Sequence, residues 1–132
     1  MFEALGISGS ALEVHQAWMD AISDNIANVN TVRPTSGAAF QSRYVLAAAV
    51  ENGSSGAGVT EVGVQLGDPR GRLVYSPEHP LADANGMVRV PDVDLGEQMT
   101  NMIMAQRGYQ ANLSNVDRVR ETYEAAIRMG HD

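Results

Sequence analysis

Residues 94–129 read DLGEQMTNMIMAQRGYQANLSNVDRVRETYEAAIRM, and the spacing of apolar residues in this stretch decides the fold. A series of large, mostly apolar residues recurs every seven positions, and another apolar residue stands four positions after every second member of this series. Together they are Leu95, Met99, Met102, Tyr109, Leu113, Val116, Tyr123 and Ile127. Such steps place side chains on one face of an α-helix. Asp94 with Glu97 matches a capping box and Gly130 is a suitable terminator, so a helix of roughly 50 Å is predicted.

A second periodic stretch lies near the N-terminus, where residues 5–29 contain no Pro. Here too, apolar residues recur every seven positions, and two more stand three positions after the last two members of this series. The set is Leu5, Leu12, Met19, Ile22, Ile26 and Val29. Ser10 with Glu13 matches another capping box, which predicts a firm helix from Ser10 and a looser turn over residues 2–9.

The middle of the chain differs in composition, because residues 31–93 hold all five Pro and most of the Gly. Short segments rich in β-branched residues occur at 43–50, 59–66, 72–75 and 87–90, separated by Asn-Gly and X-Pro turn signals. These features predict a small, loop-rich β unit. Residues 52–58 contain only small and polar residues, which predicts a flexible loop.

The predicted fold class is therefore α+β, with N- and C-terminal helices packed as a coiled-coil-like pair and a small β insert between them. The two apolar faces bury each other most simply. We expect a discontinuous helical domain of residues 1–31 and 94–132, and an insert of residues 32–93.

Charge and composition exclude several classes of protein. Nine basic residues, all Arg, stand against 16 acidic ones for a net charge of −7, which argues against nucleic-acid binding. No apolar stretch approaches membrane-spanning length, and residues 1–16 lack the cationic start and apolar run of a secretory signal, so neither membrane insertion nor a cleaved signal is expected.

The N-terminal stretch carries carboxylates but no cation, since the first basic residue is Arg33. Its ion pairs must use Arg side chains from the insert, the last helix or another subunit. Arg107, Arg118 and Arg120 are the predicted partners.

No constellation indicates catalysis, and no cofactor is expected. His15, His79 and His131 share no metal-ligand spacing, and nucleotide-binding and nucleophile-elbow motifs are absent from the sequence. The neighbouring carboxylates Asp92 and Asp94 have simpler explanations as turn and helix-cap residues. We therefore predict no catalytic, metal or cofactor site.

Two segments carry a family resemblance. Residues 23–31, SDNIANVNT, resemble the Asn-x-Ala-Asn-x-x-Thr signature that closes the N-terminal helix of flagellar rod, hook and hook-associated proteins. Residues 97–112 resemble the C-terminal helix of that family, with its Arg-x-Tyr-x-Ala-Asn core. The matching residues are Asn25, Ala27, Asn28, Asn30, Thr31, Arg107, Tyr109, Ala111 and Asn112.

Residues 75–94 are most similar to a short proximal-rod member of the family. Two departures stand out. Residues 32–40 replace the usual Asn-Thr-x-Gly-Tyr continuation, and Gly108 occupies a position where a better helix former is common. Gly108 predicts a local weak point or a close approach of the two helices.

The resemblance implies a structural subunit of the bacterial flagellar basal-body rod, polymerising with copies of itself and with other rod proteins to transmit motor torque to the hook and filament. It also implies export by the flagellar type III apparatus, a periplasmic location, and the MS ring and export gate as further candidate partners. Alternatives are another short proximal-rod subunit, a soluble coiled-coil adaptor or export chaperone, and, third, a wall-cutting hydrolase. The β-rich insert disfavours the chaperone, and the missing acid/base pair disfavours the hydrolase.

Overall fold

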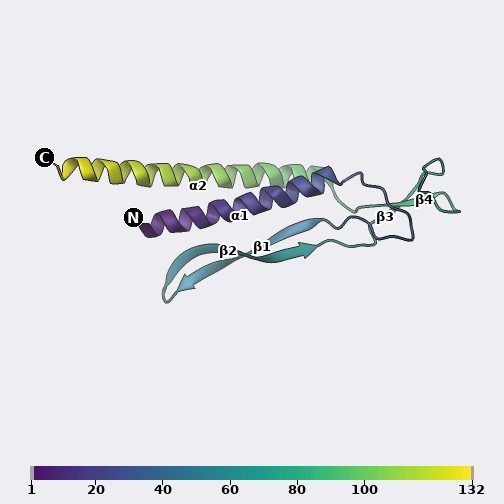
Figure 1. Cartoon of the computed structure of the whole chain (residues 1–132), viewed down its shortest axis with the longest axis horizontal. Coiled ribbons are helices and arrows are strands. Elements are labelled where there is room, and N and C mark those ends of the chain that lie inside the picture. The colour runs from purple at the N-terminus through teal and green to yellow at the C-terminus, as the bar shows by residue number, and fades with distance from the viewer. Residues whose placement is uncertain (1, 132) are drawn as a thin grey trace.

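The computed structural model describes residues 2–131 and has the predicted α+β class. Its elements, in chain order, are α1 (Phe2–Ala27), β1 (Arg43–Asn52), β2 (Ser55–Leu66), β3 (Arg72–Tyr75), β4 (Met87–Val90) and α2 (Leu95–Met129). The two helices run antiparallel, and the β1–β2 hairpin lies along the other side of α1 (Figure 1). Met1 and Asp132, the outer ends of the expected helical domain, lie outside the described residues.

Helix α2 has the predicted bounds. The Asp94 carboxylate accepts a hydrogen bond from the Glu97 backbone N–H at 3.2 Å, which caps the first turn. At the other end the Gly130 N–H donates to the carbonyls of Ala126 and Ile127, both at 3.1 Å. Gly130 does this in a right-handed conformation, with φ −80°, rather than the left-handed one common after helices.

Helix α1 begins earlier than predicted, at Phe2, so the expected capping box at Ser10 is wrong. The Ser10 hydroxyl instead donates to the Ile7 carbonyl at 2.7 Å and accepts from the Val59 N–H of β2 at 3.1 Å. The sequence pattern was misleading because Ser10 is bound by a strand that is distant in the chain. The helix ends at Ala27, and the Asn28 N–H still reaches the Asp24 carbonyl at 3.1 Å.

The β1–β2 hairpin is longer than predicted, and the expected flexible loop over residues 52–58 is wrong. Strand pairing continues to Asn52 opposite Ser55, which leaves a turn of two residues. Gly53 begins that turn at φ 68°, a conformation that glycine adopts without steric cost. The tight turn extends both strands through residues whose composition alone suggests a linker.

Strands β3 and β4 have the predicted bounds and form a second two-stranded antiparallel sheet. The chain after α1 reaches this sheet through a bridge between Arg33 and Arg89. Asp83 closes the loop before β4, because its carboxylate accepts from the N–H groups of Asn85 and Met87, both at 2.9 Å, and from the Thr35 hydroxyl at 2.9 Å. These bonds fix the path of the segment that departs from the family pattern.

Helix α1 is covered on two sides, by α2 and by the hairpin. Ala17 and Ala21 face Val45 and Val64 of the hairpin. Gly58 of β2 crosses so close to Ser10 that a Cβ there would overlap the hydroxyl oxygen. The heptad spacing predicts one apolar face on α1, toward α2. The hairpin covers a second face, where Val14 and Trp18 lie against β1 beside the smaller Ala17 and Ala21.

Candidate assembly interface

The contact between α1 and α2 contains some, but not all, of the residues predicted from the heptad spacing. Nine α2 residues are buried or half-buried, and besides Asn101 and Gly108 they recur in steps of three and four: Gln98, Met102, Ala105, Tyr109, Asn112, Val116 and Val119. The predicted Met102, Tyr109 and Val116 belong to this set. Leu95, Met99 and Leu113 instead lie exposed on the surface of α2, and the smaller or polar Gln98, Ala105 and Asn112 occupy the contact.

The last turns of α2 extend past the N-terminal end of α1 (Figure 1). The Phe2 and Tyr123 rings meet edge to face with centroids 6.0 Å apart. Beyond that level Ile127 and Met129 are exposed. The predicted residues Tyr123 and Ile127 therefore lie at, and beyond, the end of the helix pair.

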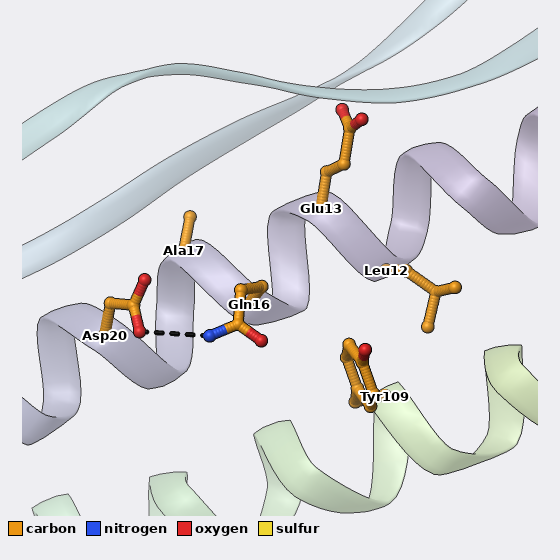
Figure 2. A pocket seen from close by; sticks show the side chains of 6 residues that line it. All are labelled: Leu12, Glu13, Gln16, Ala17, Asp20 and Tyr109. Carbon is orange, nitrogen blue, oxygen red and sulfur yellow. Dashed lines mark hydrogen bonds between the residues drawn. The ribbon is translucent and has the colours of Figure 1, made fainter.

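On α1 the residues predicted from the heptad spacing are buried or half-buried, unlike several of those on α2. Ile22 is buried, whereas Leu5, Leu12, Met19 and Ile26 are half-buried. Val29 is half-buried in the turn after the helix. Leu12 and the Tyr109 ring approach each other across the two helices (Figure 2).

The two helices approach each other closely at His15 and Gly108. A Cβ on Gly108 would overlap His15 Nε2, so only glycine fits beneath this imidazole. The ring is held in place because Nδ1 lies 2.7 Å from the Ala11 carbonyl, where it donates a hydrogen bond. The glycine that departs from the family pattern thus marks a close approach.

Asn25 joins three elements through a buried hydrogen-bond network. Its Nδ2 donates to Gln98 Oε1 of α2 and to the Arg43 carbonyl of β1, both at 3.0 Å. Its Oδ1 accepts from the Arg43 N–H at 2.7 Å. Asn25 is fully buried and Gln98 only 1% exposed. The first Asn of the family motif therefore fixes the position of both helices relative to the hairpin.

The spacing of apolar residues does not predict Gln98, because this residue is polar. A usable signal was present, since Gln98, Ala105 and Asn112 also recur every seven residues. Within residues 2–131, the buried Nε2 of Gln98 has no hydrogen-bond partner.

Other motif residues divide into two groups. Asn28 Nδ2 donates to the Asp24 carbonyl at 2.9 Å, Asn28 Oδ1 accepts from the Thr31 hydroxyl at 3.1 Å, and Asn112 Nδ2 donates to the Gly108 carbonyl at 2.9 Å. These bonds shape the end of α1 and the middle of α2. The exposed motif residues are Ala27, Asn30, Arg107 and Ala111.

The ion pair on α1 comes from the insert, because Arg43 Nη1 lies 2.9 Å from Asp24 Oδ2. An Arg from the insert was one of the predicted sources, whereas the named candidates Arg107, Arg118 and Arg120 form no ion pair with α1 among residues 2–131. Arg120 pairs with Asp117 and Glu124 of its own helix, at 3.8 Å each. Over residues 2–131, Arg107 and Arg118 form no ion pair.

An open groove of about 420 Å³ runs along one flank of α1. It is lined by Leu12, Glu13, Gln16, Ala17, Asp20 and Tyr109 (Figure 2). Gln16 donates to Asp20 at 3.1 Å. The lining combines an apolar floor with two carboxylates, which suits a cationic side chain better than a small apolar ligand.

No cluster of three or more His, Asp or Glu side chains suited to a metal ion occurs among residues 2–131. Within the same range, neither helix is long and apolar enough to cross a membrane.

Comparison with known proteins identifies both ends of the chain. Residues 5–35 match the family model described as flagella basal body rod protein, and residues 84–129 match the one described as flagellar basal body rod FlgEFG protein C-terminal. The FlgC flagellar basal-body rod protein of Yersinia enterocolitica is 32% identical over 125 residues, covering 94% of this chain and 93% of that protein. FlgC of Aquifex aeolicus is 33% identical over 128 residues, covering 94% and 92%. FlgC of Agrobacterium fabrum is 37% identical over 124 residues, covering 92% and 88%.

Proposed function

The chain belongs to the FlgC group of flagellar basal-body rod proteins, and from this premise we propose that it builds the proximal part of the rod. It is a structural subunit of the bacterial flagellar basal body. The alternative within the family, a subunit of the FlgB or FlgF type, is disfavoured because the similarity to FlgC proteins covers nearly the whole chain.

The observation that carries this proposal is the pairing of the two terminal helices with apolar side chains left outside the pair. Leu95, Met99, Ile103 and Leu113 are exposed on α2, although a helix facing only water favours polar residues there. Together with the exposed motif residues, they supply the surface through which copies of the chain and other rod proteins polymerise. The helix-packing residues predicted from the sequence are thus proposed as an assembly interface, partly within the chain and partly between chains.

The proposed mechanical role is transmission of torque from the motor to the hook and filament. Asn25 supports this role, because its fully buried side chain ties α1, α2 and β1 together through hydrogen bonds. Hydrogen bonds linked in a network strengthen one another and hold the elements that they join. A load applied to either helix therefore reaches the hairpin without a flexible joint.

We propose that residues 1–31 and 94–132 form the axial core and that residues 32–93 form an outer insert. The family further supports a periplasmic location, export by the flagellar type III apparatus, and contacts with the MS ring or export gate. We also propose that the chain is not an enzyme, since its relatives are named as rod proteins.

Deletion of the encoding gene in its host tests the proposal. We expect non-motile cells whose basal bodies stop at the inner-membrane ring, with rods and motility restored by the wild-type gene. A mutant that assembles complete rods would contradict the proposed function.

A further inference from the structure

The groove on α1 carries charge that the chain itself does not neutralise. Glu13 forms no ion pair or hydrogen bond among residues 2–131, and Asp20 accepts only from Gln16. Both carboxylates line the same groove, seven residues apart, with Leu12 and Tyr109 between the helices (Figure 2). Seven residues span about 10.5 Å of helix, so one guanidinium can lie between the two carboxylates.

A matching cation lies on the outer face of α2. Arg107 is exposed and is the only charged residue between positions 98 and 116. Helical spacing places Met104 and Ala111 on either side of it along that face. Both are exposed, so Arg107 projects from an otherwise uncharged surface that can approach another helix without further desolvation of charge.

The contact between His15 and Gly108 sets where Arg107 and the groove lie relative to each other along the helix axes, which is called their height below. The helices are antiparallel, and His15 packs on Gly108, so Arg107 lies near the height of Gln16, between Glu13 and Asp20. Within one chain Arg107 does not reach these carboxylates, since it forms no ion pair among residues 2–131. A second copy related by rotation about an axis parallel to the helices keeps the same heights and can bring its Arg107 beside the groove.

We infer that the groove lined by Glu13, Gln16 and Asp20 receives Arg107 from α2 of a second copy of this chain. The contact is heterologous, since the two surfaces differ, and it can therefore continue around a ring or helix of subunits. The planar guanidinium can bond one carboxylate in a bidentate manner while its stem covers Leu12 and Ala17. This inference rests on the proposed function, because it requires copies of the chain to lie side by side.

Site-specific cross-linking in isolated basal bodies tests the inference, since the wild-type chain has no Cys. The chain carrying Gln16→Cys and Ala111→Cys replaces the wild type in the host, and a short bismaleimide reagent is applied. Helix axes in contact lie about 8–10 Å apart, within reach of such a reagent. We expect cross-linked dimers and larger ladders of this chain alone.

Charge reversal decides whether Arg107 drives the contact. Arg107→Glu should lower the dimer yield about tenfold, because like charges then face each other across the groove. Addition of Glu13→Arg and Asp20→Arg should restore at least about half of the yield, since the charge pairing is then inverted. Arg118→Glu is the matched control, because Arg118 is exposed on the same helix but lies about three turns away, and it should leave the yield unchanged.

Three results would overturn the inference while leaving the proposed function intact. They are the absence of a dimer from a variant that is present in basal bodies, an adduct that joins the Gln16→Cys thiol to a different protein, and a dimer yield indifferent to Arg107→Glu. Absence of the wild-type chain from basal bodies would instead contradict the proposed function. Helical circular dichroism of each purified variant verifies that the substitutions leave the fold unchanged.

Discussion

The His15 imidazole lies directly over Gly108, at a close approach of the two long helices. The ring is fixed from its own helix by the hydrogen bond to Ala11. Because the space above Gly108 is filled by an aromatic ring rather than by a flexible chain end, a methyl group there cannot be accommodated without moving α1 or α2.

Gly108→Ala is therefore expected to destabilise the chain by about 1–3 kcal/mol from overpacking, reduced by up to about 1 kcal/mol of improved helix propensity. Gly6→Ala is the matched control, since nothing lies within 4 Å of a Cβ at Gly6. It should be neutral or slightly stabilising. Urea unfolding followed by circular dichroism measures both changes.

A double-mutant cycle identifies the cause. If the clash with His15 is responsible, Gly108→Ala should cost much less in a His15→Ala background, because the ring is then absent. An equal cost in both backgrounds would attribute the effect to the helix backbone instead.

The features predicted correctly from the sequence are those that neighbouring residues determine. Asp94, Gly130 and the bounds of β3 and β4 follow from capping and turn chemistry, which involve only neighbouring residues. Ser10 was misassigned because its hydroxyl bonds a strand 49 positions away. Tertiary contacts of this kind cannot be read from local spacing.

The residues of the candidate interface were also predictable only in part. The seven-residue spacing correctly placed Met102, Tyr109 and Val116 in the helix contact. It also placed Leu113 there because Leu is apolar, whereas in the structure Asn112 lies in the contact and Leu113 is exposed. Hydrophobicity alone cannot distinguish a face that packs within the chain from one left outside. In an assembling protein both faces are apolar. The periodicity therefore predicts the helix but not which of its faces packs within the chain.

Asn25→Ala should cost about 2–4 kcal/mol, because it leaves the buried Gln98 Oε1 and the partly buried Arg43 N–H without their hydrogen-bond partner. Asn30→Ala is the matched control, since Asn30 belongs to the same motif but is exposed, and it should change stability by less than about 0.5 kcal/mol. Thermal unfolding of the purified variants measures the difference. Equal costs would show that the network contributes little.

Ile22→Ala and Leu113→Ala separate packing within the chain from packing between chains. Ile22 is 2% exposed, whereas Leu113 is 42% exposed. Ile22→Ala should cost about 2–5 kcal/mol of folding free energy, and Leu113→Ala less than about 1 kcal/mol. If Leu113 belongs to the assembly interface, its variant should fold normally yet reduce motility in the complemented host. Normal motility with Leu113→Ala would remove this residue from the proposed interface.

Asp83 makes the stability of the β3–β4 unit depend on pH. Hydrogen bonds from the Met87 N–H, the Thr35 hydroxyl and the Asn85 N–H hold the pKa of Asp83 below its ordinary value. A carboxyl whose pKa is lowered by folding stabilises the folded state above its unfolded pKa, and this contribution is lost as the pH falls through the folded pKa. Amide exchange of Met87 should therefore accelerate below that range in the wild type.

Asp83→Asn should remove this acid dependence, since the amide does not titrate, and should weaken protection of Met87 at neutral pH. Glu78→Gln is the control, because Glu78 is an exposed carboxylate in the same region, and it should leave the acid dependence unchanged. An acid dependence that persists in Asp83→Asn would assign the effect to another carboxyl. Exchange rates measured by nuclear magnetic resonance across the acid range decide between these outcomes, because they report on the β3–β4 unit separately from the helices.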